Sequence, residues 1–261
     1  MLDWLSQDLS EFTVFILLGL FVAAVIAGYI DTLVGGGGLI TIPALLFAGV
    51  SPLQALGTNK LQASAGTGTA TLTLIAKKSL RFSTVKWLML MAFFGATLGA
   101  AAVQYVDDEV LRFVIPAVIL LISLYFLLAP KHNVLGGNAR VSNQVYRATA
   151  VPSIGFYDGM FGPATGSFFV LAGVSLRGQS IVNASIIAKS LNFATNVASL
   201  LVFFWFDQVA VALGIVMMFG QFVGASFGAR ALITINPDRL RYLVVAMCLI
   251  MLFMWFFNQQ G

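Results

Sequence analysis

Four charged residues lie deep inside apolar segments of this 261-residue chain, and they form two pairs that repeat. Asp31 lies in GYIDTLVGGGGLI and Asp158 in GFYDGMFGPATGS, 127 positions later. Lys60 lies in GTNKLQASAGTGT and Lys189 in IIAKSLNFATN, 129 positions later. A charge at membrane depth costs at least ~2.5–3.5 kcal/mol on insertion scales, so four retained charges indicate a purpose. A pair duplicated in two halves of one chain predicts a binding site between two repeats.

Small polar residues accompany both lysines. On a helix, residues three, four or seven positions apart share a face, and this spacing aligns polar side chains with each lysine. These residues, with the neighbour of Lys60, are Asn59, Ser64, Thr67, Asn192 and Asn196. Two lysines that converge with hydroxyls and amides describe a pocket for an oxyanion, and we expect Lys60 and Lys189 to face a common central cavity. Two alternatives stay open: the polar residues join helices, or each lysine neutralises the aspartate of its own half.

Two breaks rich in glycine follow the aspartates, GGGG at 35–38 and GPATG at 162–166. Glycine lets the backbone leave helical geometry, and the short apolar run after each break would begin a helix whose free N–H groups attract an anion. The candidate residues in the breaks are Gly36, Gly37, Gly38, Thr165 and Gly166. The alternative is a break that only permits close helix packing.

The roles of Asp31 and Asp158 are less defined by the sequence. Each precedes a turn, which favours a structural role in capping a helix or holding a loop. The alternative is a coupling role, in which the carboxylate takes up a proton during transport.

The elements around these residues predict an all-α polytopic membrane protein. Hydrophobic residues make up 59% of the chain, charged residues 9%, and the mean hydropathy is +0.95. Five apolar runs stand on each side of a polar linker; they lie at about 12–33, 39–48, 54–76, 85–106 and 110–129, then at about 144–160, 165–174, 181–206, 208–231 and 240–257. Runs 39–48 and 165–174 are too short to span the bilayer, so we expect about eight long helices and two half-helices. The predicted division is a first repeat at 1–130, a linker at 131–144 and a second repeat at 145–261.

The charge of equivalent loops predicts that the two repeats are inverted. The gap at 77–86 carries four basic residues and its counterpart at 206–215 carries none, whereas the acidic gap at 106–112 corresponds to a basic one at 235–241. By the positive-inside rule these equivalent loops lie on opposite sides of the membrane. The linker is then cytoplasmic and both termini are periplasmic, and Arg177, expected outside, is the one exception to the charge pattern. The acidic start lacks the basic region of a signal peptide, so the first run is expected to stay as a membrane segment.

The residue types give no support for several other functions. The chain has one cysteine, Cys248, and one histidine, His132, and no pattern for a metal site, a nucleotide site or a catalytic constellation. We therefore expect no catalytic residues, no metal and no cofactor. No basic tract stands outside the loops beside the membrane, so nucleic-acid binding is not expected either.

The motifs together resemble the TauE/SafE family of sulfite and organosulfonate exporters, in particular its YfcA-like branch. The most specific segments are AGYIDTLVGGGGLITIPALL, ALGTNKLQA, GFYDGMFGPATGSF, AKSLNFATN and GQFVGASFGAR, which are spread over residues 27–230. The resemblance implies a bacterial inner-membrane protein that transports a small sulfur-containing anion such as sulfite, a sulfonate or thiosulfate. The residues themselves leave a channel-like conduit and a membrane scaffold as alternatives, and an intramembrane enzyme would need a catalytic pair that is not evident. A homodimer stays an open alternative as a partner.

Overall fold

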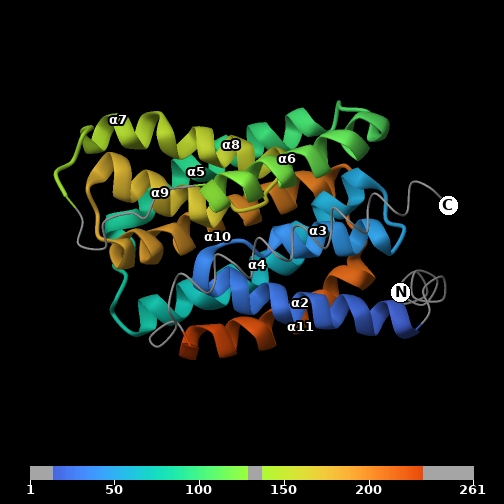
Figure 1. Cartoon of the computed structure of the whole chain (residues 1–261). Coiled ribbons are helices and arrows are strands. Elements are labelled where there is room, and N and C mark those ends of the chain that lie inside the picture. Colours follow the sequence, from blue (N-terminus) through green and yellow to red (C-terminus); the bar gives the residue numbers. More distant parts are fainter. Residues whose placement is uncertain (1–13, 129–136, 232–261) are drawn as a thin grey trace.

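The computed structural model describes residues 14–128 and 137–231, which form helices joined by short turns (Figure 1). The helices are α2 (Val14–Val34), α3 (Gly38–Phe47), α4 (Pro52–Ala76), α5 (Phe82–Val103), α6 (Asp108–Leu128), α7 (Asn143–Ala148), α8 (Ala150–Met160), α9 (Thr165–Arg177), α10 (Ile181–Trp205) and α11 (Val211–Ala231). Within the described ranges there is no strand. The all-α class predicted from the sequence is confirmed.

Four of the described helices, α2, α5, α10 and α11, are long and apolar enough to cross a membrane. The helices α3 and α9 are short, as predicted for the two half-helices. One difference concerns the run at 144–160, which forms two helices, α7 and α8, that meet at Thr149 rather than one. The last predicted run, at 240–257, and both termini lie outside the described residues.

Equivalent helices recur at constant offsets. α4 and α10 both contain 25 residues, and α10 begins and ends 129 positions after α4. Both begin in the same way, because the Ser51 hydroxyl accepts a hydrogen bond from the Gln54 N–H and the Ser180 hydroxyl accepts one from the Asn183 N–H. α9 has 13 residues where α3 has 10, so the extra residues of the second half lie at the end of this half-helix.

The backbone conformations repeat as well. Positive φ angles occur in equivalent pairs: 86° and 91° at Gly35 and Gly162, and 56° and 55° at Lys78 and Asp207. The second pair occupies the turn after α4 and after α10, and its two residues carry opposite charges. Equivalent turns thus carry a lysine in the first half and an aspartate in the second. This is the same exchange of loop charge from which the sequence predicts inverted repeats.

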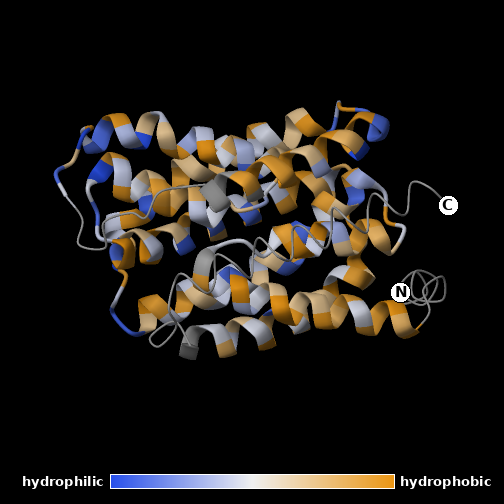
Figure 2. Cartoon of the chain, viewed as in Figure 1, coloured by the Kyte–Doolittle hydropathy of each residue, from blue (hydrophilic) through white to orange (hydrophobic). Residues whose placement is uncertain are grey.

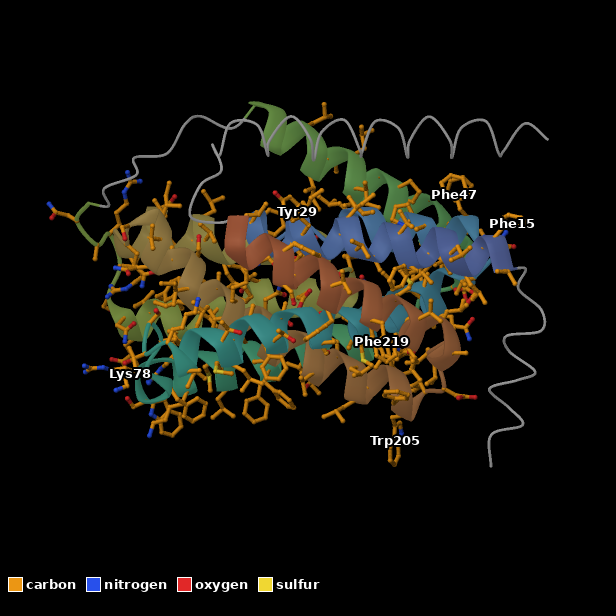
Figure 3. The ribbon with its side chains drawn as sticks, turned by 90° about the horizontal axis from the view of Figure 1, so that it is seen from below. Phe15, Tyr29, Phe47, Lys78, Trp205 and Phe219 are labelled. Carbon is orange, nitrogen blue, oxygen red and sulfur yellow. The ribbon has the colours of Figure 1, made fainter. Side chains whose placement is uncertain are left out.

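The two halves run in opposite directions through the molecule. Lys78 follows the end of α4 and Trp205 is the end of α10, and these equivalent ends point toward opposite ends of the helix bundle (Figure 3). Phe15 near the start of α2 and Phe47 at the end of α3 lie toward the same end as Trp205. α2 and α3 thus form a hairpin that enters and leaves at one end, with the glycine break at its tip.

The first helix of each half packs against the fourth helix of the other. α2 contacts α11 and α8 contacts α5, while α4 and α10 pack on each other between them. Glycines allow these close approaches in equivalent places. A Cβ at Gly224 would lie 1.9 Å from the Val25 carbonyl oxygen, and one at Gly95 would lie 2.2 Å from that of Pro152. The backbones therefore touch directly, as small residues allow in membrane helices.

The outside of the bundle carries large apolar side chains. Leu98 and Phe219 are 65% and 61% exposed, and apolar colouring runs along the outer faces of the helices (Figure 2). Such a surface suits lipid, because lipid tails are as apolar as these side chains. These helices and their apolar outer surface indicate a multi-pass membrane protein.

Arg177 corrects one expectation about sidedness. Its guanidinium donates to the Val141 carbonyl, and the Arg140 N–H donates to the Leu176 carbonyl 2.9 Å away. The end of α9 is thus bonded to the linker, not placed on the opposite side from it. The expectation was wrong because α9 begins at the break inside the bundle and returns to the end where α7 begins. Arg177 is then no exception to the charge pattern.

We predict that Gly224→Ala lowers the stability of the purified protein, because its Cβ would overlap the Val25 carbonyl. Overpacking of this kind typically costs about 1–3 kcal/mol. Gly19→Ala in α2 is the matched control, since a Cβ there meets nothing within 4 Å. Thermal unfolding in detergent, followed by intrinsic fluorescence, would test both. Equal melting temperatures for the two variants would contradict the close packing of α2 and α11.

Candidate functional site

The two buried lysines bind across the halves. The Lys60 ammonium lies 2.8 Å from Asp158 Oδ1 and also donates to the Asp158 backbone carbonyl. The Lys189 ammonium lies 3.7 Å from Asp31 Oδ2 and donates to the Asp31 backbone carbonyl. The alternative in which each lysine neutralises the aspartate of its own half is therefore wrong. Both ion pairs join one half of the chain to the other.

Each aspartate also holds the break that follows it. Asp31 Oδ1 accepts a hydrogen bond from the Gly37 N–H at 3.2 Å. Asp158 Oδ1 accepts one from the Thr165 hydroxyl at 2.8 Å. Each carboxylate therefore connects its own break to the lysine of the other half, which matches the structural role that the sequence favours. A coupling role stays a prediction, and the same geometry is compatible with it.

The two breaks are non-helical at 35–37 and 161–164, and they contact each other. A Cβ at Gly35 would lie 2.7 Å from the Gly166 Cα, and one at Gly38 would lie 3.4 Å from the Pro163 Cα. The half-helices α3 and α9 begin at Gly38 and Thr165. Their N-termini, which carry partial positive charge, therefore lie on either side of this contact.

Two predicted amide residues lie at the beginnings of the half-helices. The Asn59 side-chain nitrogen is 3.5 Å from the position that a Cβ of Gly38 would take, and the Asn192 side-chain nitrogen is 3.4 Å from the position that a Cβ of Gly166 would take. Asn59 Oδ1 accepts hydrogen bonds from the Thr41 hydroxyl at 2.6 Å and from the Gln62 amide at 2.8 Å. These bonds fix the amide so that its nitrogen, a donor, is directed to the break.

Other predicted residues donate to their own helix. The Ser64 hydroxyl donates to the Lys60 carbonyl and the Thr67 hydroxyl to the Ala63 carbonyl, both at 2.7 Å. The Asn196 amide donates to the Asn192 carbonyl at 2.8 Å. A hydroxyl has one proton to donate, so Ser64 and Thr67 in this arrangement have only acceptor capacity left. Their predicted role as donors to an anion requires another rotamer.

Several residues at the site do not stand out in the sequence. Gly35 and Gly162 carry the left-handed backbone of the breaks, and a Cβ at Gly162 would lie 2.8 Å from the Lys60 ammonium. Thr41 and Gln62 position Asn59. A run of four glycines signals a break but not which member needs a positive φ. Thr41 lies 18 residues from Asn59, so no spacing rule connects them.

The electrostatics of the site are unusual because all four charges are withdrawn from solvent. Lys60 and Asp158 are each 1% exposed, and Lys189 and Asp31 are each 8% exposed. A buried ion pair gains little net stability, since the cost of desolvating two charges offsets their attraction. Two such pairs in equivalent places indicate a function rather than a stabilising device. Among the described residues, no group of three or more His, Cys, Asp and Glu side chains could hold a metal ion.

An apolar helical bundle with duplicated broken hairpins and paired charges at their contact defines a membrane transporter. Residues 20–254 match the family described as sulfite exporter TauE/SafE, and the chain belongs to this family. The resemblance of its motifs is thereby confirmed.

Relatives cover most of the chain. It is 46% identical over 211 residues to a probable membrane transporter protein, ORF9, of Sinorhizobium sp., which covers 81% of each chain. It is 42% identical over 247 residues to the probable membrane transporter protein YfcA of Escherichia coli K12, covering 94% of this chain and 92% of the relative. A probable membrane transporter protein of Haemophilus influenzae is 40% identical over 232 residues, covering 89% and 91%. No solved structure matches the chain.

Proposed function

We propose that the protein is a secondary transporter, working as an exporter, of a small sulfur-containing anion such as sulfite, a sulfonate or thiosulfate. The anion would bind between the two halves, where the breaks meet, and alternating access would result from movement of one half against the other. The name of the family supports the class of substrate.

One observation carries the proposal: each buried lysine is held by the aspartate of the other half. Relative movement of the halves must therefore stretch or break at least one of these ion pairs. A broken pair exposes an ammonium group beside the N–H donors of a half-helix and a side-chain amide. That combination of positive charge and donors is what an oxyanion requires.

We further propose that the protein lies in the bacterial inner membrane with the linker in the cytoplasm and both termini in the periplasm. The four basic residues at 77–86 and the basic residues of the linker support this orientation. The surrounding partner is the lipid bilayer, and a homodimer stays a prediction.

Flux of ³⁵S-labelled sulfite into proteoliposomes would test the transport proposal. We expect uptake above that of empty vesicles, and a strong loss in Lys60→Ala and Lys189→Ala variants that insert normally. Ser226→Ala in α11 is a control, since the Ser226 hydroxyl donates to its own helix, at the Phe222 carbonyl. Wild-type uptake no faster than in empty vesicles, for sulfite, methanesulfonate and thiosulfate alike, would overturn the proposed function.

Membrane orientation is tested separately with single cysteines in a Cys248→Ala background. A cysteine at Asn138, in the linker, should react with an impermeant maleimide only from the cytoplasmic side. A cysteine at Gln208, in the turn after α10, should react only from the periplasmic side. Labelling of both positions from one side would exclude the inverted arrangement.

A further inference from the structure

The two ion pairs are equivalent in sequence position but differ in strength. The Lys60–Asp158 pair is 2.8 Å long and both side chains are 1% exposed. The Lys189–Asp31 pair is 3.7 Å long and its side chains are 10% and 11% exposed. The first is a short contact between fully buried side chains, whereas the second is longer and its side chains are about a tenth exposed.

The difference follows from the residues in the two breaks. Asp158 Oδ1 is held by both the Lys60 ammonium and the Thr165 hydroxyl, whose single proton is shared with the Gly162 carbonyl oxygen 2.9 Å away. The residue equivalent to Thr165 is Gly38, which has no side chain. Asp31 is therefore held at its own break only by the Gly37 N–H, at 3.2 Å.

The charges of the site restrict how an anion can enter. Two ammonium and two carboxylate groups sum to zero, and all four are buried. A monovalent anion that joined them would leave a buried net charge of minus one, which is strongly unfavourable away from water. A proton taken up by one carboxylate restores neutrality.

Resting on the proposed function, we propose that the Asp31–Lys189 pair is a proton-operated switch for the anion, while the Lys60–Asp158 pair is a fixed clamp between the halves. A proton binds to a carboxylate oxygen of Asp31, and the neutral acid ends the ion pair with Lys189. The ammonium keeps its bond to the Asp31 backbone carbonyl and binds the anion with its other N–H donors. One proton and one negative charge enter together, so the charge of the site is unchanged. Asp158 is unsuited to this step because its protonation would leave Lys60, at 1% exposure, charged and unreachable. Its Oδ2, which has no hydrogen-bond partner, is buried as well.

Among the described side chains, Lys189 is the charged group that faces the Asp31 carboxylate. α3, which packs against α2, carries no titratable residue, and α4 carries Lys60, which Asp158 holds. α9 carries Arg177 at the end away from the break, where it bonds to Val141. The described side chains of α11, at 211–228, include no titratable group. Within α2, the other titratable residue is Tyr29. Protonation of Asp31 therefore acts on one charged partner, Lys189.

Steady-state accumulation of ³⁵S-sulfite in vesicles loaded with gluconate would test the switch, at mildly acidic pH where bisulfite, a monovalent anion, prevails. The pH is equal on both sides, a potassium gradient with valinomycin sets the potential, and uptake by empty vesicles is subtracted. Wild-type accumulation should not respond to potential, because a proton accompanies the anion. In Asp31→Asn the anion moves alone, so accumulation should change about tenfold for each ~59 mV. Asp158→Asn, the matched variant, should instead lower the melting temperature and leave any remaining uptake insensitive to potential.

The outcomes separate this inference from the proposed function. If the wild type takes up none of the three anions, the proposed function and the switch are both wrong. Wild-type accumulation that follows potential as a single charge would overturn the switch while transport stands, and this result does not depend on any variant folding. A gain of potential dependence in Asp158→Asn rather than in Asp31→Asn would also overturn it, because the roles of the two pairs would be reversed.

Discussion

Replacing Lys60 with methionine is expected to lower the free energy of unfolding by about 3–5 kcal/mol, because it leaves the Asp158 carboxylate buried without its partner. Asp158 is 1% exposed, so solvent cannot replace the lost ammonium. Chemical unfolding in detergent micelles, followed by tryptophan fluorescence, would measure the loss. The yield of folded protein in the membrane should fall with it.

Two further variants distinguish the effect of the broken ion pair from the effect of losing the lysine side chain itself. Adding Asp158→Asn to Lys60→Met removes the unpaired charge and should recover a large part of the stability, which a double-mutant cycle measures. Lys189→Met should cost clearly less than Lys60→Met, since its pair is longer and more exposed. If the two lysine variants lose equal stability, the assignment of a clamp and a looser pair is wrong.

Gly35→Val is expected to abolish anion flux while much of the protein still inserts. The substitution has two costs at the same residue. Gly35 has φ of +86°, where a residue with a side chain is strained by about 1–2 kcal/mol or more. Its Cβ would also lie 2.7 Å from the Gly166 Cα and so force the two breaks apart. Labelled-sulfite flux, normalised to the amount of reconstituted protein, would measure the effect.

Gly36→Ala in the same run is the matched control. Its φ is not in the positive range, and the nearest atom to its Cβ would be a Leu39 methyl at an ordinary 3.5 Å. We expect flux close to that of the wild type. Gly35→Val with normal flux would show that contact between the breaks is not needed for transport.

Much of the architecture follows from local patterns. Apolar runs of membrane length predict the long helices. Unpaired backbone N–H and C=O groups are very costly in lipid, and only a helix or a closed barrel pairs them all. The motif offsets of 127 and 129 predict the duplication, and the helix bounds of α4 and α10 reproduce the second offset at both ends. The breaks were predictable because four glycines in a row, or glycine followed by proline, strongly disfavour a continuous helix.

Tertiary structure was needed to decide how the four charges pair. Duplication identifies Lys60 and Lys189 as equivalent, but pairing within a half and pairing between halves have the same composition and the same symmetry. The choice depends on how the helices pack, here with Lys60 of α4 reaching Asp158 of α8 and Lys189 of α10 reaching Asp31 of α2. The roles of the hydroxyls could not be decided from the sequence for a similar reason. The hydroxyls of Ser64 and Thr67 can donate either to a ligand or to the backbone carbonyl four residues earlier in their own helix, and they do the latter.

By itself, the sequence determined that this is a duplicated helical membrane protein with two lysines, two aspartates and two breaks in equivalent positions. These features depend on composition and on spacing along the chain. Only the tertiary structure decided that each lysine crosses to the other half, that the breaks touch at Gly35 and Gly166, and that one ion pair is tight and the other loose. These features depend on distances between residues up to 158 positions apart, which helix packing sets and local spacing does not.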